Sequence, residues 1–117
     1  MCVVTTLEQQ TGATSATGTL LAVDISTFQK QMHALYGERD RARGAERTFV
    51  WFTEECGELA RAVFRERDAN RMEHEFSDVL AWLASLANLA GVDLQEAAQR
   101  YASGCPRCGG QPCHCPR

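Results

Sequence analysis

Five acidic side chains lie in two short stretches whose apolar residues have helical spacing. They are Glu54, Glu55 and Glu58 in TEECGEL, and Glu75 and Asp78 in EFSD. At about 100° of rotation per residue, Glu55 and Glu58 are displaced from the apolar stripe of their helix in one rotational sense. Glu75 and Asp78 are displaced from theirs by similar angles in the same sense, whereas Glu54 points nearly away from the core. The two pairs are therefore geometric copies of one another.

Two helices, expected at about 46–65 and 71–90, must position these acids. Only a short turn at 66–70 separates them, so they should be antiparallel neighbours. Equal offsets on two antiparallel helices fall on the same side of the interface. This places Glu58 level with Glu75, and Glu55 level with Asp78. The sequence thus predicts four carboxylates at one edge of a helical hairpin.

Four clustered carboxylates repel one another unless protons or cations compensate their charge. A hard divalent cation with oxygen ligands is the simplest partner, and Mg²⁺ usually completes its shell with waters and substrate phosphates. The pattern therefore indicates a Mg²⁺ (or Mn²⁺) site of the kind that acts on nucleotides. The alternative is a solvated acidic face relieved by neighbours such as Arg61, three residues after Glu58.

Two tryptophans extend the acidic flank of each helix by one turn. Trp51 lies four residues before the first acidic pair and Trp82 four residues after the second, so the two indoles should stand level. Beside a metal site they could form a platform for base stacking, or they could simply cover the rim of the core. At the end of the hairpin nearer the turn, Arg65 and Arg71 are close enough for one of them to meet phosphates.

The remaining helical pattern predicts an all-α fold. A first helix, capped by Asp24 or Ser26, should end at about Gly37, and the arginine-rich stretch GERDRARGAER should be a polar connection. A fourth helix should begin at the capping-box-like Asp93 and end near Ser103. No strand pattern competes with these helices.

Four cysteines lie close together near the C-terminus. They are Cys105, Cys108, Cys113 and Cys115 in CPRCGGQPCHC. Pro and Gly in such a knuckle let backbone amides face the sulfurs, and four soft thiolates suit tetrahedral Zn²⁺. We interpret the segment as a structural zinc-binding tail. His114 could replace one cysteine, and a redox-active or disulfide-forming tail is the alternative.

Composition limits the class of protein. The 117 residues are 44% apolar and 23% charged, with a net charge of -3, which is ordinary for a soluble globular domain. Stable nucleic-acid binding is not expected from this charge. Neither a transmembrane run nor a secretory signal is evident, so we expect a cytoplasmic protein without a membrane partner. The expected parts are a flexible arm (1–23), a helical domain (24–103) and the Cys-rich tail (104–117).

The pattern EExxE at 54–58 followed by ExxD at 75–78 resembles the MazG-like all-α nucleotide pyrophosphohydrolase superfamily. The likeness covers about residues 25–102 and includes Asn88 and Asp93 of an NxxGxD ending. It implies an antiparallel helical bundle completed by oligomerisation, as a homodimer or a homotetramer. It also implies hydrolysis of a nucleoside triphosphate between the α and β phosphates, which gives a monophosphate and pyrophosphate.

The same resemblance implies roles for individual residues. The implied Mg²⁺ ligands are Glu55, Glu58, Glu75 and Asp78. Glu54 and Glu55 are the implied catalytic acids, with Glu54 as a supporting acid or water orienter and a carboxylate as the acceptor of the proton from the attacking water. The candidates for substrate binding are Trp51, Trp82, Lys30, Asn88 and Arg65, with His33 beside Lys30 on the first helix.

Two other functions are compatible with the sequence. A non-catalytic helical interaction module with a zinc-binding tail would keep the acids as a vestige, although such a module has no need of a self-repelling cluster. A phosphoribosyl-ATP pyrophosphatase-like enzyme would use similar helices on a different substrate.

Overall fold

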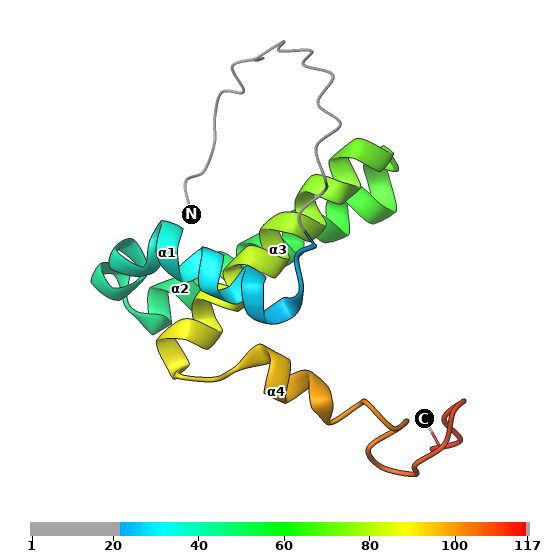
Figure 1. Ribbon diagram of the computed structural model, residues 1–117. Coiled ribbons are helices and arrows are strands. Elements are labelled where there is room, and N and C mark those ends of the chain that lie inside the picture. The colour runs from blue at the N-terminus through cyan, green and yellow to red at the C-terminus, as the bar shows by residue number, and fades with distance from the viewer. Residues whose placement is uncertain (1–21, 117) are drawn as a thin grey trace.

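The computed structural model describes residues 22–116, which are helical apart from short connections and the C-terminal tail (Figure 1). The elements are α1 (Ile25–Arg43), α2 (Ala45–Arg61), the π-helical segment η1 (Ala62–Glu66), α3 (Ala69–Ala90) and α4 (Leu94–Gln99). The predicted all-α class is confirmed. No described helix is both long enough and apolar enough to cross a membrane. The predicted arm at 1–23 lies almost entirely outside the described residues.

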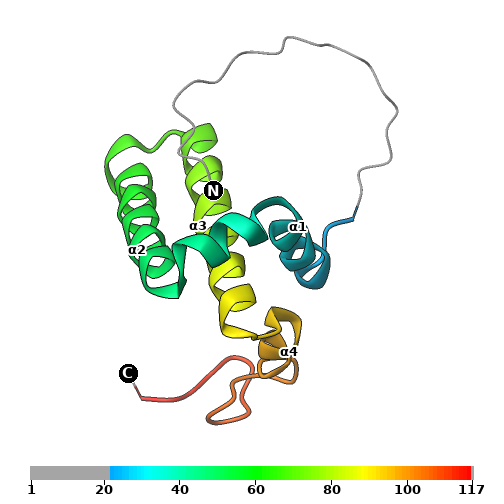
Figure 2. The same ribbon diagram turned by 90° about the vertical axis from the view of Figure 1, so that its left-hand side faces the viewer.

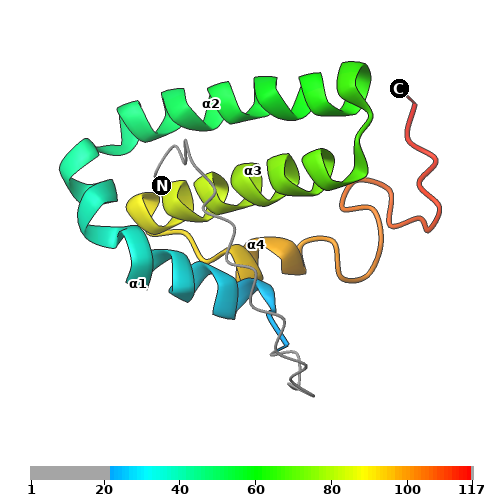
Figure 3. The ribbon, with the colours of Figure 1, turned by 90° about the horizontal axis from the view of Figure 1, so that it is seen from above.

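Helices α2 and α3 form the predicted antiparallel hairpin and lie side by side (Figures 2 and 3). The chain leaves η1 through Arg67, whose φ of 54° is in the left-handed region and whose N–H donates to the carbonyl of Ala62 at 2.9 Å. Asp68 then caps α3 by accepting a hydrogen bond from the N–H of Arg71 at 2.8 Å. The reversal therefore needs only two residues outside the helices, which holds the two acidic stretches in register.

The predicted end of the first helix at about Gly37 is wrong, because α1 continues to Arg43. The arginine-rich stretch is helical because Asp40 turns inward and is only 1% exposed, and Arg43 pairs with it at 3.0 Å. Gly37 is itself buried, against the ring of His33. The corner lies instead at Gly44, whose φ of 85° suits glycine and ends the helix.

A side-chain network ties the start of α1 to the corner between α3 and α4. The Gln29 amide donates to the Asn88 side chain at 3.1 Å and to the carbonyl of Val92 at 2.8 Å. Its oxygen accepts from the N–H of Leu94 at 2.9 Å. Asn88 in turn donates to the backbone carbonyl of Gln29 at 3.2 Å. One glutamine therefore fixes how α1 crosses the hairpin.

The fourth helix begins as predicted, with Asp93 accepting from two N–H groups of its first turn at 2.8 and 3.1 Å. It was predicted to end near Ser103, but it ends at Gln99. The next residues form i→i+3 turns, with the Tyr101 N–H donating to Ala98 at 3.0 Å, before the chain enters the tail. The proposed domain boundaries remain predictions.

The core among the described residues is small. Its buried apolar residues are Met32, Ala62, Trp82, Ala84 and Ala87. Several large apolar side chains of the hairpin are exposed, including Phe49, Phe64 and Phe76 at 58%, 74% and 58%. The hairpin thus leaves an apolar surface uncovered within a single chain.

Candidate functional site

Three of the four predicted carboxylate ligands come together between α2 and α3. Glu55, Glu75 and Asp78 each offer an oxygen, and these oxygens all lie within 4.8 Å of one another. Glu75 is buried at 5% exposure, Glu55 is half-buried and Asp78 is exposed. The group therefore has an inner end in the hairpin and an outer end open to solvent. Glu54 is exposed on the neighbouring position of α2.

The crowding of these acids changes the protonation of Glu55. Burial raises the pKa of the Glu55 carboxyl above its ordinary value, and the charges of Asp78, Glu75 and Glu54 raise it further. A hydrogen bond from Trp82 opposes this shift by stabilising the carboxylate. Glu55 therefore holds its proton to higher pH than an exposed glutamate does, and a cation among the three acids would relieve the repulsion.

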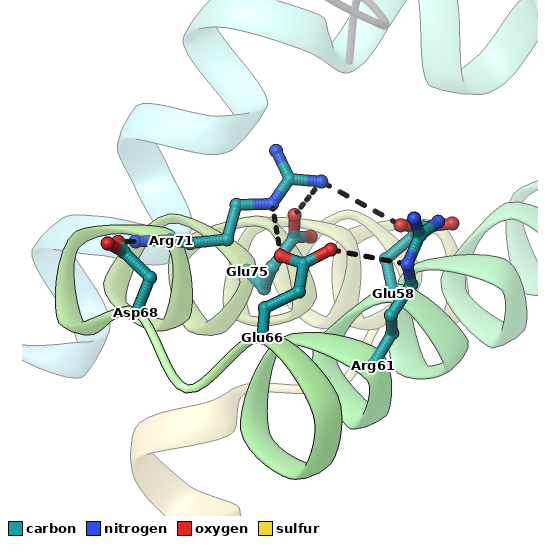
Figure 4. A network of polar contacts seen from close by, with 6 residues as sticks. All are labelled: Glu58, Arg61, Glu66, Asp68, Arg71 and Glu75. Atoms are coloured by element: carbon teal, nitrogen blue, oxygen red, sulfur yellow. Dashed lines mark hydrogen bonds and ion pairs between the residues drawn. The ribbon is translucent and has the colours of Figure 1, made fainter.

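The fourth predicted ligand, Glu58, lies outside this group of three and faces a network of ion pairs (Figure 4). Arg71 Nη2 lies 3.8 Å from Glu58 Oε2 and 3.1 Å from Glu75 Oε1. Arg71 Nε lies 3.4 Å from Glu66 Oε2, and Arg61 Nε lies 3.2 Å from Glu66 Oε1. An arginine thus bridges Glu58 and the buried Glu75, both of which are predicted ligands.

The two tryptophans stand level, with ring centroids 6.3 Å apart and planes inclined by 16°. Trp82 is only 3% exposed, whereas Trp51 is 37% exposed. The guanidinium of Arg43 lies 4.8 Å from the centroid of the Trp82 ring. Of these two rings, only that of Trp51 therefore has an accessible face, while Trp82 supports it and contacts Glu55.

Three of the other candidates for substrate binding lie in a pocket apart from the carboxylate group. Lys30, His33 and Asn88 line an open pocket of about 400 Å³ between α1 and the α3–α4 corner, and none of its lining residues belongs to the carboxylate group. Both polar atoms of the Asn88 side chain are already engaged with Gln29. Arg65 is exposed on η1.

A buried polar group at the α1–α2 corner was not predicted from the sequence. Arg43 Nη1 donates to Asp40 Oδ1 at 3.0 Å and to Thr48 Oγ1 at 3.3 Å, and both acceptor residues are buried. Arg43 contacts the ring of Trp82, and Trp82 in turn donates a hydrogen bond to Glu55. Arg43 therefore connects this corner to the carboxylate group. The available signal was the i, i+3 spacing of Asp40 and Arg43, which the interpretation of the stretch as a loop concealed.

The four cysteines of the tail also come together. Each offers an Sγ atom within 4.8 Å of the others, with separations of 3.4 Å for Cys105–Cys113 and 3.8 Å for Cys105–Cys115 and Cys108–Cys113. Zn–S bonds of about 2.3 Å in a tetrahedron place the sulfurs about 3.8 Å apart. The four sulfurs therefore have nearly the spacing that zinc requires.

The backbone of the tail favours thiolates. The N–H of Gly110 donates to Cys108 Sγ and the N–H of Cys115 to Cys113 Sγ, each at 3.4 Å. Backbone hydrogen bonds from His114 and Gly110 lower the pKa of Cys108 to about 6. Side-chain hydrogen bonds with Cys113 and Cys108 raise the pKa of Cys115 to about 11, so that cysteine holds its proton until a metal replaces it. The His114 ring lies over Gly110, where a Cβ atom would meet it at 2.6 Å, and it is not part of the sulfur group.

One protein family matches the part of the chain that carries both acidic stretches. Residues 43–105 match the MazG nucleotide pyrophosphohydrolase domain. A comparison with curated proteins finds no match. The matched range covers more than half of the 117 residues. The chain therefore belongs to the MazG nucleotide pyrophosphohydrolase family, as the spacing of its acidic motifs predicted.

Proposed function

We propose that this protein hydrolyses a nucleoside triphosphate between the α and β phosphates, with Mg²⁺ or Mn²⁺, into a nucleoside monophosphate and pyrophosphate. The observation that carries the proposal is the convergence of Glu55, Glu75 and Asp78 in a member of the MazG family. Three clustered carboxylates repel a triphosphate, so they can act on one only with cations between them.

The donor set fits such a cation. Octahedral Mg²⁺ with bonds of about 2.1 Å places its ligand oxygens about 3 Å or 4.2 Å apart, and the three carboxylates offer oxygens within 4.8 Å of one another. We assign Glu55, Glu75 and Asp78 as ligands, with Glu58 as the fourth. The bound cation would neutralise phosphate charge and acidify the attacking water.

The carboxylates also supply the acid–base chemistry. Glu55 is the proposed acceptor of the proton from water, because it is half-buried within the carboxylate group that would hold the cation and the attacking water. Glu54, exposed beside it, is proposed to orient the water or to support the proton transfer. The hydrogen bond from Trp82 favours the charged form of the Glu55 carboxyl.

We propose that the nucleobase of the substrate stacks on Trp51, whose accessible ring is backed by the nearly parallel ring of Trp82. Trp82 would then contribute from behind and not by direct contact. Lys30 is proposed to meet the substrate from α1, and Arg65 from η1, since both are exposed. Asn88 would act by holding α1 on the hairpin, because its side chain is already occupied.

A second copy of the chain is proposed to complete the site, as a homodimer or a homotetramer. The hairpin carries a set of exposed apolar side chains that a second hairpin would cover. They are Phe49, Val50, Phe64, Phe76, Leu80 and Leu83. Burial of such a surface is the usual driving force of association.

The cysteine tail is proposed to hold one structural Zn²⁺ through four thiolates. Native mass spectrometry should therefore give one zinc for each chain. The same spectrum should show two or four chains in each particle, as the proposed assembly requires. Treatment with a strong chelator should remove the zinc and unfold the tail, because its fold depends on the metal. A zinc-free native mass, with disulfides in its place, would contradict this assignment, and a monomer would contradict the proposed assembly.

Incubation with standard and modified nucleoside triphosphates tests the reaction. With Mg²⁺, the protein should release one pyrophosphate for each monophosphate, and removal of Mg²⁺ should abolish the release. Released orthophosphate would indicate cleavage at the γ phosphate instead. If folded, zinc-loaded protein releases no pyrophosphate from any of the nucleotides, the hydrolase function is wrong.

A further inference from the structure

Arg71 is the arginine that the hairpin brings to the carboxylates. Its guanidinium reaches acids from three elements: Glu58 of α2 at 3.8 Å, Glu66 of η1 at 3.4 Å and Glu75 of α3 at 3.1 Å (Figure 4). Its backbone N–H is held by Asp68 at 2.8 Å, in the first turn of α3. The base of this side chain is thus fixed, and its charged end lies among acids.

Two of these three acids are the proposed cation ligands Glu58 and Glu75. A divalent cation bound by them would stand within a few ångströms of the guanidinium, and the two positive charges would repel each other. The guanidinium and the cation therefore compete for the same carboxylates. Glu66 lies outside the carboxylate group and can keep its hold on Arg71.

The side chain of Arg71 is able to change partners. It is 49% exposed, and its partner Glu58 is 43% exposed, so neither is locked by packing. The head of an arginine can swing about its flexible stem while the helix stays in place. A displaced guanidinium at this position would stand beside the cation, where the phosphates of a bound nucleotide must lie.

We propose that Arg71 is the counter-ion of the cation-free site and becomes the phosphate-binding group of the loaded site. It pairs with Glu58 and Glu75 while these carry no cation, and it turns to the departing pyrophosphate once a cation holds them. A planar guanidinium binds phosphate oxygens in pairs, which suits this second role. The inference rests on the proposed function for the identity of the phosphate ligand.

Binding measurements on the full chain test both roles. Without nucleotide, Arg71→Gln should bind Mn²⁺ at least about threefold more tightly than the wild type, because a competitor is removed. At saturating Mg²⁺, the same variant should bind inorganic pyrophosphate roughly tenfold more weakly, because a charge-assisted pair is lost. Opposite changes in the two affinities are the signature, since damage to the fold would weaken both.

Two further variants make the comparison specific. Arg61→Gln removes the other arginine paired with Glu66, and both affinities should stay within about twofold of the wild type. Arg71→Lys keeps the charge but loses the planar fork, so Mn²⁺ affinity should change little while pyrophosphate binding weakens. This second variant decides the matter if Arg71→Gln fails to fold.

Unchanged or weaker Mn²⁺ binding by folded Arg71→Gln would overturn the proposal, and so would unchanged pyrophosphate affinity. Neither measurement requires turnover. An inactive wild-type protein would therefore remove the proposed reaction while leaving the competition between Arg71 and the cation fully testable.

Discussion

The double variant Glu55→Gln, Glu58→Gln is expected to lose at least about 10³-fold in kcat/KM for pyrophosphate release. Each amide removes one negative charge and one anionic ligand, and loss of even an outer-shell partner of a metal ligand typically costs 10–100-fold. Glu55 belongs to the converging group, and Glu58 is linked through Arg71 to buried Glu75. Steady-state pyrophosphate release and Mn²⁺ titration measure the effect.

A matched control removes the same number of charges from the hairpin at positions away from the carboxylate group. Glu46 of α2 and Glu73 of α3 are both exposed and lie outside that group. The variant Glu46→Gln, Glu73→Gln should keep most of the activity and of the Mn²⁺ affinity. If the test variant keeps more than about a tenth of the wild-type activity, the carboxylates do not carry the reaction.

The stability of the cation-free protein is an independent test of the raised pKa of Glu55. Its pKa is raised above 4.5 in the folded state, so the protonated form stabilises the fold, and that stability is lost as the pH rises through the folded pKa. At pH 7 the ionised group therefore destabilises the cation-free fold. The single variant Glu55→Gln should melt no lower than the wild type without cations, and added Mn²⁺ should stabilise it less.

Asp40→Ala is expected to destabilise the fold by about 3 kcal/mol, because it leaves the guanidinium of Arg43 without its carboxylate partner at a buried corner. Asp40 is 1% exposed and pairs with Arg43 at 3.0 Å, and Arg43 also contacts Thr48 and the ring of Trp82. For a fold of this size, about 3 kcal/mol corresponds to a fall in Tm of roughly 12–24 °C. Calorimetry or circular dichroism measures it.

Glu38→Ala is the control, since Glu38 is an exposed acid on the same helix and its loss should change stability by about 0.5 kcal/mol or less. Tryptophan fluorescence adds a second measurement for Asp40→Ala, because Arg43 lies over Trp82. A Tm within a few degrees of the wild type would show that the buried pair does not hold the corner.

Local patterns in the sequence were sufficient to predict the hairpin and its family. Apolar spacing and a short turn place two helices antiparallel, and residues mirrored about that turn must meet, so spacing alone places Glu55 opposite Asp78. The cap at Asp93 depends only on its neighbours and was also predictable. Such features follow from the sequence because the interactions that set them span a few residues or one fixed turn.

Contacts between distant segments decided the rest. Helix α1 runs past Gly37 because Asp40 is buried at a corner that α2 and α3 help to form. Trp82 is buried because Arg43 of that corner lies over its ring. Glu58 faces Arg71 and lies outside the group of three carboxylates. The sequence determined which charges this protein carries and on which helices. Only the tertiary structure decided how they pair, because a charged side chain takes the partner that packing brings within a few ångströms.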